Sequence, residues 1–425
     1  MTHKSSFILC LFLLILPHFA LCQGEFNTWY IGYYPITTTA GISFNPGYPS
    51  PIPNGVVGKS SAAVSDSLGN LLFATDSRYV YNKNLEVMPN GCCILCSGRS
   101  NSQPILVTPK LGDDSSYYIF STGPYTPANT FKLCYSVVNM RLDGRLGDLD
   151  TNFINVPVPG ASTSWESVAG TRHMNNKDIW IVTTISYYDS IKYASFLMTE
   201  AGISSTPVLS PSMGDQKFTP SPPLPPYMYS PLVLRISPDG TKLAACYDNK
   251  TEFCSFNPST GLVTRLFFIN PGAYSVGGSV TEFSIDSKFL YFSTCFPDYS
   301  SRLYQFDATK ADSAQFMQSK ILLDSTLPRA PYLQMGPDWK IYGTENSKDS
   351  LSVISNPSVQ GLGCNFQYNG VGLNGICSDW LPQFIQRYKA YIHSEGQCQS
   401  DSIYFSGDIW PPADSIRWNF GDPGS

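Results

Sequence analysis

The feature of this sequence that most constrains its fold is a repeat, in which a polar turn followed by a hydrophobic strand returns at intervals of about 45 to 60 residues. A strand-like run precedes each instance and a second hairpin pattern follows it, so each unit predicts four antiparallel strands. Four strands joined by hairpins form one blade of a β-propeller. The instances are SDSLGNLLFAT at 65–75, GDDSSYYIFST at 112–122, MNNKDIWIVTT at 174–184, SPDGTKLAACY at 237–247, SIDSKFLYFST at 284–294 and GPDWKIYGTE at 336–345.

The stretches that flank these units predict one more blade, built from both ends of the chain. Residues 28–32 and 41–45 read as strands at the start, and residues 364–373 read as a strand at the end. We therefore expect an all-β propeller of about seven four-stranded blades, with six or eight as alternatives. An open ring would expose a strand edge, so we predict that an N-terminal strand pairs with a strand between Leu351 and Leu373. A β-sandwich array or two stacked domains is the alternative architecture.

Composition agrees with many short strands and turns. Charged and aromatic residues each make up 14% of the chain, and there are 33 glycines and 33 prolines. The net charge is only -5 and no Lys/Arg cluster is present, so nucleic acid is not an expected partner. The proline-rich stretch 210–231 predicts a long surface loop, or alternatively a polyproline ligand for a partner.

The N-terminus predicts a signal peptide over residues 1–22. Lys4 gives a positive start, Phe7 to Leu16 an apolar run, and Ala20-Leu21-Cys22 a cleavage site, so the mature chain should begin at Gln23. A membrane-spanning helix and lipid attachment at Cys22 are the alternatives. The apolar run is about half the roughly 20 residues that a span needs. We expect a protein that is secreted or held on the outer cell surface, with no transmembrane segment in its mature part.

Ten of the 12 cysteines would remain in an exported chain, where disulfides can persist. Cys246 and Cys254 flank a turn-like stretch centred on Lys250, which predicts a cross-strand disulfide, and Cys364 and Cys377 bracket a similar stretch. Alternatively, some of these cysteines are simply buried small hydrophobic residues. A zinc site would use Cys92, Cys93 and Cys96, but a second ligand pair at finger spacing is lacking.

Several stretches resemble the propellers of large exported proteins of the Bacteroidetes group, with WD-like or Tol-B-like repeats followed by PKD (polycystic kidney disease) modules. The resemblance rests on GNLLFATDSRYVYNKNLEVMPNG, YYIFSTG, YSVVNMRLDGRLGDL, RISPDGTKLAA, TEFSIDSKFLYFST and LPQFIQRY. The ending DSIRWNFGDPGS is similar to the WDFGD signature of a PKD module, with Asn419 in place of the first Asp.

This resemblance implies a propeller over residues 23–390 and the incomplete start of a PKD-type Ig-like module over 391–425. It also implies type IX secretion and a role in adhesion. A tripeptide similar to the O-glycosylation sequon of such bacteria occurs at seven serines: Ser67, Ser190, Ser313, Ser325, Ser350, Ser402 and Ser415.

The sequence offers little catalytic chemistry, and no catalytic, cofactor-binding or metal-binding residue is predicted. Only His173 and His393 survive signal cleavage, and HExxH and GxSxG motifs are absent. We expect a structural role for His173 and a surface position for His393. Carboxylates that could act in pairs, as in glycosidases, are Asp113 with Asp114 and Asp148 with Asp150. Asp239, Asp286 and Asp338 are interpreted as turn-forming residues.

The leading hypothesis is a secreted or cell-surface binding, adhesion or scaffolding protein. In it the propeller is a platform for a protein or glycan ligand and the PKD-type module is a spacer. The alternative is a propeller enzyme that acts on glycans or lactones through turn carboxylates or bound calcium. Loop aromatics that could stack on sugars or anchor a partner are Tyr33, Tyr34, Trp165, Tyr187, Tyr188, Tyr227, Tyr229 and Tyr299.

Overall fold

The computed structural model describes residues 26–31, 40–43, 50–52, 61–76, 78–92, 94, 103–122, 133–161, 164–187, 190–212, 233–247, 250–269, 279–296, 300–345, 348–377, 380–385, 389–395 and 404–410. The chain divides into two compact units, one formed by Gln23–Arg387 and the other by Met1–Cys22 with Tyr388–Ser425. The predicted signal peptide and nearly all of the proline-rich stretch lie outside the described residues, and both stay predictions.

Within the described part of the larger unit, six antiparallel sheets of four or five strands follow one another along the chain. Their strands are β4 (Ala62–Ser65), β5 (Leu71–Thr75), β6 (Tyr79–Asn82), β7 (Val87–Cys92); β8 (Ile105–Lys110), β9 (Asp113–Thr122), β10 (Leu133–Asn139), β11 (Asp148–Leu149), β12 (Val156–Pro157); β13 (Ser164–Arg172), β14 (Ile179–Tyr187), β15 (Ser190–Thr199), β16 (Gly202–Ile203), β17 (Val208–Pro211); β18 (Val233–Ile236), β19 (Lys242–Cys246), β20 (Thr251–Phe256), β21 (Val263–Ile269); β22 (Ser279–Phe283), β23 (Phe289–Cys295), β24 (Ser301–Asp307), β25 (Ile321–Leu327); and β26 (Tyr332–Met335), β27 (Ile341–Thr344), β28 (Ser350–Ile354), β29 (Phe366–Gly372).

A three-stranded sheet precedes them, formed by β1 (Thr28–Ile31), β2 (Ala40–Ser43) and β3 (Ser50–Ile52). Helical structure among the described residues is short: α1 (Ser313–Gln318), and the 3₁₀ turns η2 (Asp143–Arg145), η3 (Thr151–Phe153) and η6 (Gly361–Cys364). The predicted all-β class is therefore confirmed.

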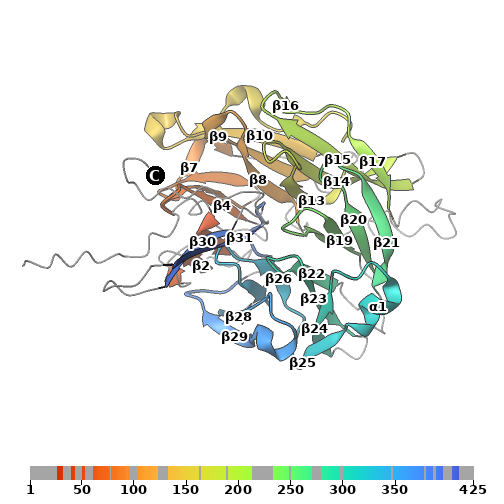
Figure 1. Cartoon of the computed structure of the whole chain (residues 1–425). Coiled ribbons are helices and arrows are strands. Elements are labelled where there is room, and N and C mark those ends of the chain that lie inside the picture. The colour runs from red at the N-terminus through yellow and green to blue at the C-terminus, as the bar shows by residue number, and fades with distance from the viewer. Residues whose placement is uncertain are drawn as a thin grey trace, which may run out of the picture. The chain divides into compact units, whose positions relative to one another are not determined.

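The sheets of the larger unit stand around a common centre, as Figure 1 shows. The first strand of each sheet contacts the first strand of the next, in the order β1, β4, β8, β13, β18, β22 and β26. Every residue of β4 and of β22 is buried, as expected for strands covered on both faces by neighbouring sheets. Consecutive four-stranded antiparallel sheets in a ring define a β-propeller-like fold. The number of blades stays a prediction.

The ring does not close by the strand pairing that we predicted. Among the described residues, β1, β2 and β3 pair only with one another, and β28 pairs with β27 and β29. The sheet of β26–β29 has all four strands from one continuous stretch of chain, so it borrows none from the N-terminus. Trp29 of β1 instead packs edge-on against Tyr342 of β27, with ring centroids 5.8 Å apart.

Closure depends on a segment that follows the last sheet, Trp380–Ile385, which we call the strap. Its Phe384 stacks on Phe26, next to β1, with ring centroids 4.6 Å apart. Its Leu381 is buried in the cluster that contains Trp29. The strap therefore joins the start of the described chain to the sheet of β26–β29 through side chains.

Two residues that flank Phe384 in the strap reach inner strands on the opposite side of β4. Gln383 donates through Nε2 to the carbonyl oxygens of Ile105 and Val168, the latter at 2.7 Å. Ile385 belongs to the core cluster of β8, β13 and their neighbours. A Cβ atom on Gly170 of β13 would lie 2.9 Å from Cδ1 of Ile385, so Ile385 packs directly against the backbone of β13. The strap thus ties β1 to β8 and β13.

Both predicted disulfides are wrong, because all four cysteines are buried free thiols. The hairpin that carries Cys246 closes between Tyr247 and Lys250, not around Lys250. Cys246 therefore pairs with Thr251, and Cys254 pairs with Leu243, three positions away on the same strand as Cys246. The two sulfur atoms point to opposite faces of the sheet.

The second predicted pair fails because its members have separate surroundings. Cys364 is buried in the turn η6, whereas the Sγ atom of Cys377 donates to the backbone oxygen of Glu345 at 3.1 Å. The alternative reading as buried small residues holds for these four cysteines. Cys92 and Cys134, by contrast, each take part in a disulfide bond.

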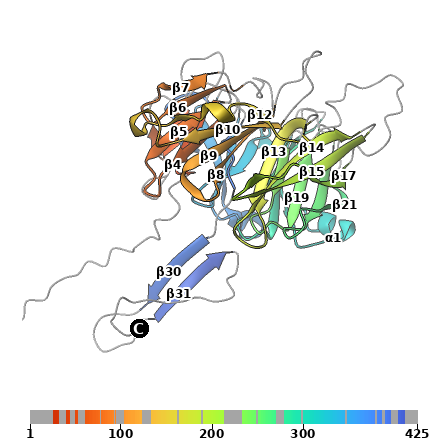
Figure 2. The same ribbon diagram turned by 90° about the horizontal axis from the view of Figure 1, so that it is seen from above.

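The smaller unit is described only as an antiparallel hairpin of β30 (Lys389–Glu395) and β31 (Tyr404–Trp410), drawn in Figure 2. His393 lies on β30 and pairs with Ser406. The PKD-type identity of this unit and its boundary at residue 391 stay predictions.

Removing the side chain of Ile385 should weaken the whole ring. Ile385→Ala leaves a cavity between β8 and β13 and should lower the free energy of unfolding by about 2–5 kcal/mol. Leu362→Ala is the control, because this side chain is 78% exposed and its loss should change stability by less than about 0.5 kcal/mol. Urea unfolding followed by tryptophan fluorescence measures both, and equal stabilities of the two variants would contradict the role of the strap.

Candidate functional site

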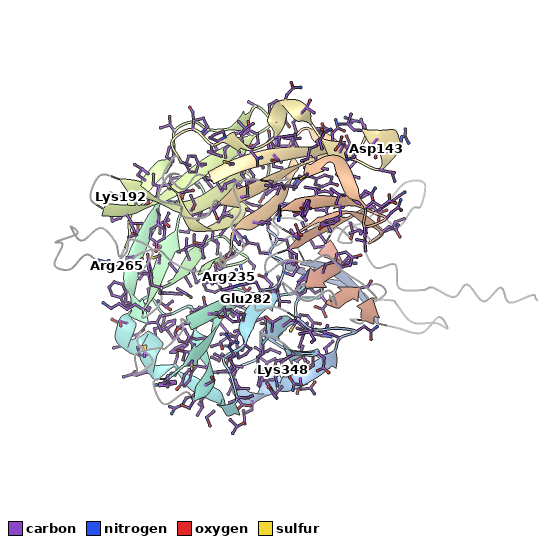
Figure 3. The ribbon with its side chains drawn as sticks, turned by 180° about the vertical axis from the view of Figure 1, so that it is seen from behind. Asp143, Lys192, Arg235, Arg265, Glu282 and Lys348 are labelled. Atoms are coloured by element: carbon purple, nitrogen blue, oxygen red, sulfur yellow. The ribbon has the colours of Figure 1, made fainter. Side chains whose placement is uncertain are left out.

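A buried ion pair lies near the middle of the ring, where Figure 3 shows Arg235 and Glu282 side by side. Nε of Arg235, on β18, is 3.3 Å from Oε2 of Glu282 on β22, and the two side chains are only 9% and 6% exposed. Arg235 also donates through Nη2 to the carbonyl oxygen of Leu333 on β26 at 3.0 Å. Three successive inner strands are therefore held together by one guanidinium group.

Both oxygens of the Glu282 carboxylate already accept hydrogen bonds within the protein. Oε1 accepts the backbone N–H of Phe283 at 2.9 Å, and Oε2 accepts that of Met335 at 3.0 Å in addition to the contact with Arg235. Burial raises the pKa of Glu282, and the charge of Arg235 and these N–H donors oppose the rise. These contacts of Glu282 hold β18, β22 and β26 together.

Amide side chains occupy the neighbouring part of the ring centre. Gln103 donates to the carbonyl oxygen of Leu234 at 2.9 Å, accepts the N–H of Leu234 at 2.9 Å, and also donates to Oε1 of Gln383. These bonds satisfy backbone groups of inner strands that have no further strand beside them. Gln334 of β26 is buried as well, and its Oε1 has no hydrogen-bond donor.

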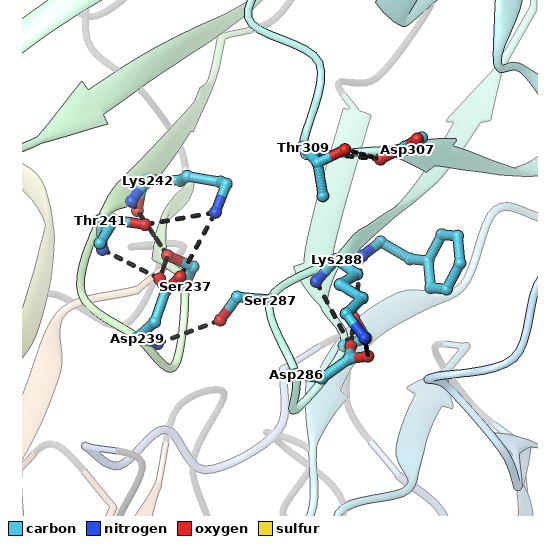
Figure 4. A network of polar contacts seen from close by, with 11 residues as sticks. Ser237, Asp239, Thr241, Lys242, Asp286, Ser287, Lys288, Asp307 and Thr309 are labelled. Atoms are coloured by element: carbon cyan, nitrogen blue, oxygen red, sulfur yellow. Dashed lines mark hydrogen bonds and ion pairs between the residues drawn. The ribbon is translucent and has the colours of Figure 1, made fainter. Parts of the chain in front are cut away.

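The turn-forming interpretation of Asp239 and Asp286 is confirmed, as Figure 4 shows. Oδ1 of Asp239 accepts the hydroxyl of Ser237 at 2.5 Å and the backbone N–H of Thr241 at 3.0 Å. A lysine two or three residues further on pairs with the other oxygen in each turn, at 3.4 Å for Lys242 and 3.5 Å for Lys288. These carboxylates hold the repeats in shape.

Most of the other carboxylates named in the sequence analysis are also bonded within the protein. Asp338 accepts the hydroxyl of Tyr342 at 2.7 Å. Asp150 caps η3 by accepting the N–H of Asn152 at 3.0 Å, and Asp148 accepts two bonds from Asn90. Asp113 pairs with Arg141 at 3.2 Å, and hydrogen bonds from neighbouring serines lower its pKa to about 2. Asp114 is exposed.

His173 has the structural role that we expected. Its Nδ1 accepts the backbone N–H of Asn175 at 3.0 Å, and its Nε2 lies 3.1 Å from the carbonyl oxygen of Ser259. The imidazole of His173 thereby ties its own turn to the turn between β20 and β21.

One buried carboxylate differs from the rest. Five such side chains are buried among the described residues, and in four of them donors reach both oxygens. The fifth is Glu345, directly after β27, whose Oε2 accepts the hydroxyl of Tyr368 at 3.2 Å while Oε1 has no hydrogen-bond donor. It is the one oxygen without a donor among the buried carboxylates of the described residues, which makes Glu345 a candidate functional group. The saturated four are Asp76, Asp148, Glu252 and Glu282.

Groups on three segments influence the Glu345 carboxyl group. It stands at the end of β27, Tyr368 comes from β29, and Arg329 comes from the connection between β25 and β26. Burial raises the pKa of Glu345, and the hydrogen bond from Tyr368 and the positive charges of Lys348 and Arg329 oppose the rise. Pro331 lies against Gly343, where an added Cβ would come within 2.8 Å, so the Arg329 connection is held close to β27.

Sequence reasoning missed Glu345, although one signal was present. The sixth repeat, GPDWKIYGTE, ends in glutamate, whereas the fifth, SIDSKFLYFST, ends in threonine. A charge at the end of a buried strand needs partners, and the sequence does not say which.

The sheet β26–β29 also carries a hollow of about 530 Å³. Its lining includes Tyr342, Val353, Gln367 and Leu373, together with Lys340, which is paired with Asp338 at 3.4 Å. Its mixture of apolar and polar side chains and its size are typical of small-molecule sites.

The other residues brought forward by the sequence are not gathered at one place. Of the serines in the glycosylation pattern, Ser67, Ser313 and Ser325 are exposed and Ser350 is half-buried. The side chain of Ser190, residues Ser402 and Ser415, and all eight loop aromatics lie outside what the structure describes, or have side chains that it does not describe. Glycosylation and aromatic recognition stay predictions.

Within the described ranges, no three His, Cys, Asp or Glu side chains come together as a potential metal site. None of the helices in those ranges is long and apolar enough to cross a membrane.

Comparison with known proteins yields likeness at the level of structure alone, since no protein-family model and no curated protein matches the chain. The periplasmic gluconolactonase of Pseudomonas aeruginosa is similar at 12% identity and a TM-score of 0.49, over 84% of this chain and 99% of that one. A putative 6-phosphogluconolactonase from Bacteroides uniformis matches at 14% identity and a TM-score of 0.43, over 83% and 97%. A putative TolB from Agrobacterium tumefaciens matches at 14% and 0.36, over 73% and 90%. Likenesses this distant carry no argument about function.

Breaking the central ion pair should destabilise the ring strongly. Arg235→Met leaves the Glu282 carboxylate buried without its counter-charge and should cost about 3–5 kcal/mol. The matched control is Arg141→Met, which removes an ion pair whose arginine is 66% exposed and should cost about 0–1 kcal/mol. Urea denaturation measures both, and a small effect of Arg235→Met would show that the ring does not depend on the pair.

Glu345→Gln should change the pH dependence of stability in a defined direction. The pKa of Glu345 is raised in the folded state, so its favourable contribution is present below the unfolded pKa of about 4.3 and is lost as pH rises through the folded pKa. The neutral glutamine avoids this loss, so the variant should gain stability relative to the wild type between pH 3.5 and pH 7. Asp113→Asn is the control with the opposite sign, because the pKa of Asp113 is lowered to about 2. Melting curves across this range decide the point, and the same sign for both variants would contradict it.

Proposed function

We propose that this protein is an exported binding or scaffolding protein, secreted or held on the outer cell surface. In this proposal the loops of the propeller bind a protein or glycan ligand. The C-terminal unit is a spacer of the PKD type. The N-terminal signal pattern supports export. The ligand is recognised by loop ends of the sheets, where propeller-like scaffolds carry their variable residues.

The observation that carries the proposal is that Arg235, Glu282 and Gln103 at the ring centre are all engaged within the protein. Both oxygens of Glu282, the guanidinium of Arg235 and the amide of Gln103 are bonded within the protein. A catalytic centre there would need groups free to reach a substrate. These groups hold inner strands together, which favours a rigid platform.

The second candidate is an enzyme that acts on lactones or glycans, and Glu345 is the observation that favours it. A carboxyl group with a raised pKa and an oxygen free of donors is a property of general acids and bases. Hydrolysis of glycosides needs a second carboxylate, and each of the other buried carboxylates in the described ranges is saturated. A binding function needs no second free carboxylate, so it agrees better with the described residues than glycoside hydrolysis does.

Hydrolysis assays on the full-length mature chain separate the two functions. We expect no release of acid from glucono-1,5-lactone above the spontaneous rate, and no cleavage of p-nitrophenyl glycosides, while a glycan or protein array gives saturable binding. Turnover that is lost in Glu345→Gln would overturn the binding proposal in favour of the enzyme. Asp76→Asn is the matched control, because Asp76 is equally buried and is bonded to Tyr81 at 3.1 Å.

A further inference from the structure

We propose that the hollow on the sheet β26–β29 binds a neutral sugar, either free or as one residue of a glycan. This inference rests on the proposed function, because it gives the ligand of the platform a chemical class and a place. The hollow has a volume of about 530 Å³, which is within the range of small-ligand sites. Its lining comes from this sheet and from the residues that directly follow it.

A bulge in β29 shapes the hollow. Val353 of β28 pairs with Gln367 of β29. The next pair is Leu351 with Val371, so one residue of β28 lies opposite three residues of β29. Asn369, in the middle of these three, has a left-handed backbone with φ of 53°. A bulge bends its strand out of the regular plane, so β29 becomes a wall beside β28.

The hollow is open to a ligand from solvent. Gln367, Gly372 and Asn374 of its lining are exposed, and Ser355 is half-buried. Val353, by contrast, is buried and provides apolar surface inside the hollow. A ligand that enters therefore meets polar groups at the rim and apolar groups deeper in.

The lining has one charged residue, and its charge is balanced. Nζ of Lys340 is 3.4 Å from Oδ2 of Asp338, which also accepts the hydroxyl of Tyr342 at 2.7 Å. An anionic ligand would compete with Asp338 for the ammonium group, and a cationic ligand would be repelled by that group. The geometry therefore favours a ligand without charge.

The other polar groups of the lining are neutral and are available to a ligand. They are the amides of Gln367 and Asn374 and the hydroxyl of Ser355, and no hydrogen bond within the described ranges engages these side chains. Amides and hydroxyls both donate and accept hydrogen bonds, as the hydroxyl groups of a sugar do. Val371 and Leu373 add apolar surface for the C–H groups of a sugar ring. A pyranose carries this same combination of groups.

A peptide strand is the alternative occupant, and the bulge disfavours it. β29 is the last strand of its sheet, where a peptide would add by backbone pairing. Such pairing needs a regular strand edge, whereas the bulge interrupts β29. Recognition at this hollow therefore depends on side chains.

The experiment titrates the full-length mature protein with D-glucose, D-mannose and D-galactose by isothermal calorimetry. We expect one site for at least one of these sugars. The 2-amino derivative and the uronate of that sugar place a positive or a negative charge on the same ring, and both should bind more weakly. Gln367→Met and Asn374→Ala should each weaken binding of the neutral sugar about three- to tenfold, because a neutral hydrogen bond is lost.

The matched control is Gln360→Met, because this glutamine is exposed and lies outside the lining, at the start of η6. Its affinity for the sugar should equal that of the wild type, and all three variants should melt at the wild-type temperature, since the replaced side chains are exposed.

The inference is overturned if no neutral sugar binds, or if a charged derivative binds more tightly than its neutral parent. It is also overturned if Gln367→Met binds as the wild type does, or if Gln360→Met weakens binding equally. A failure at the hollow with array binding intact would leave the platform function standing, whereas turnover of a lactone or glycoside would remove that function instead.

Discussion

The contact between Arg235 and Glu282 shows the constraint on which the rest of this fold depends. Inner strands of a ring meet where no further strand can pair with them, so their polar groups need other partners. One guanidinium reaches from β18 past β22 to a carbonyl oxygen of β26, and one carboxylate accepts from two backbone N–H groups. Side chains thereby complete bonds that sheet pairing cannot make.

The same constraint explains how the first and last described segments of the larger unit meet. The sheet β26–β29 is complete by itself, so β1 has no vacant strand position to occupy there and packs through Trp29. The strap then provides both kinds of contact that a closing strand would provide, apolar burial through Leu381 and Ile385 and polar bonding through Gln383. Closure is a property of side chains, and it couples the first described strand to the last segment of the larger unit.

A functional group is better sought among carboxylates whose oxygens are not all bonded within the protein. The turn aspartates and the central pair are all bonded within the protein, where they stabilise the turns and the ring. Glu345 has the same burial with one donor fewer, so the difference between a structural and a candidate functional carboxylate comes down to a count of hydrogen bonds. One free oxygen can accept one hydrogen bond from a ligand, whereas glycoside hydrolysis needs two available carboxyl groups. The count of hydrogen bonds therefore favours recognition over catalysis.

The sequence by itself determined the features that depend on neighbours along the chain. Alternating strands and Asp-containing turns repeat in the sequence, and a turn such as Ser237 to Lys242 is bonded within six residues, so its structure could be predicted. Only the tertiary structure decided the register of Cys246 against Cys254, the closure by the strap and the free oxygen of Glu345. A shift of the hairpin centre leaves the local pattern intact yet turns a side chain to the other face. The strap and the carboxylate depend on partners far away in the sequence, whose positions are fixed only when the sheets pack together.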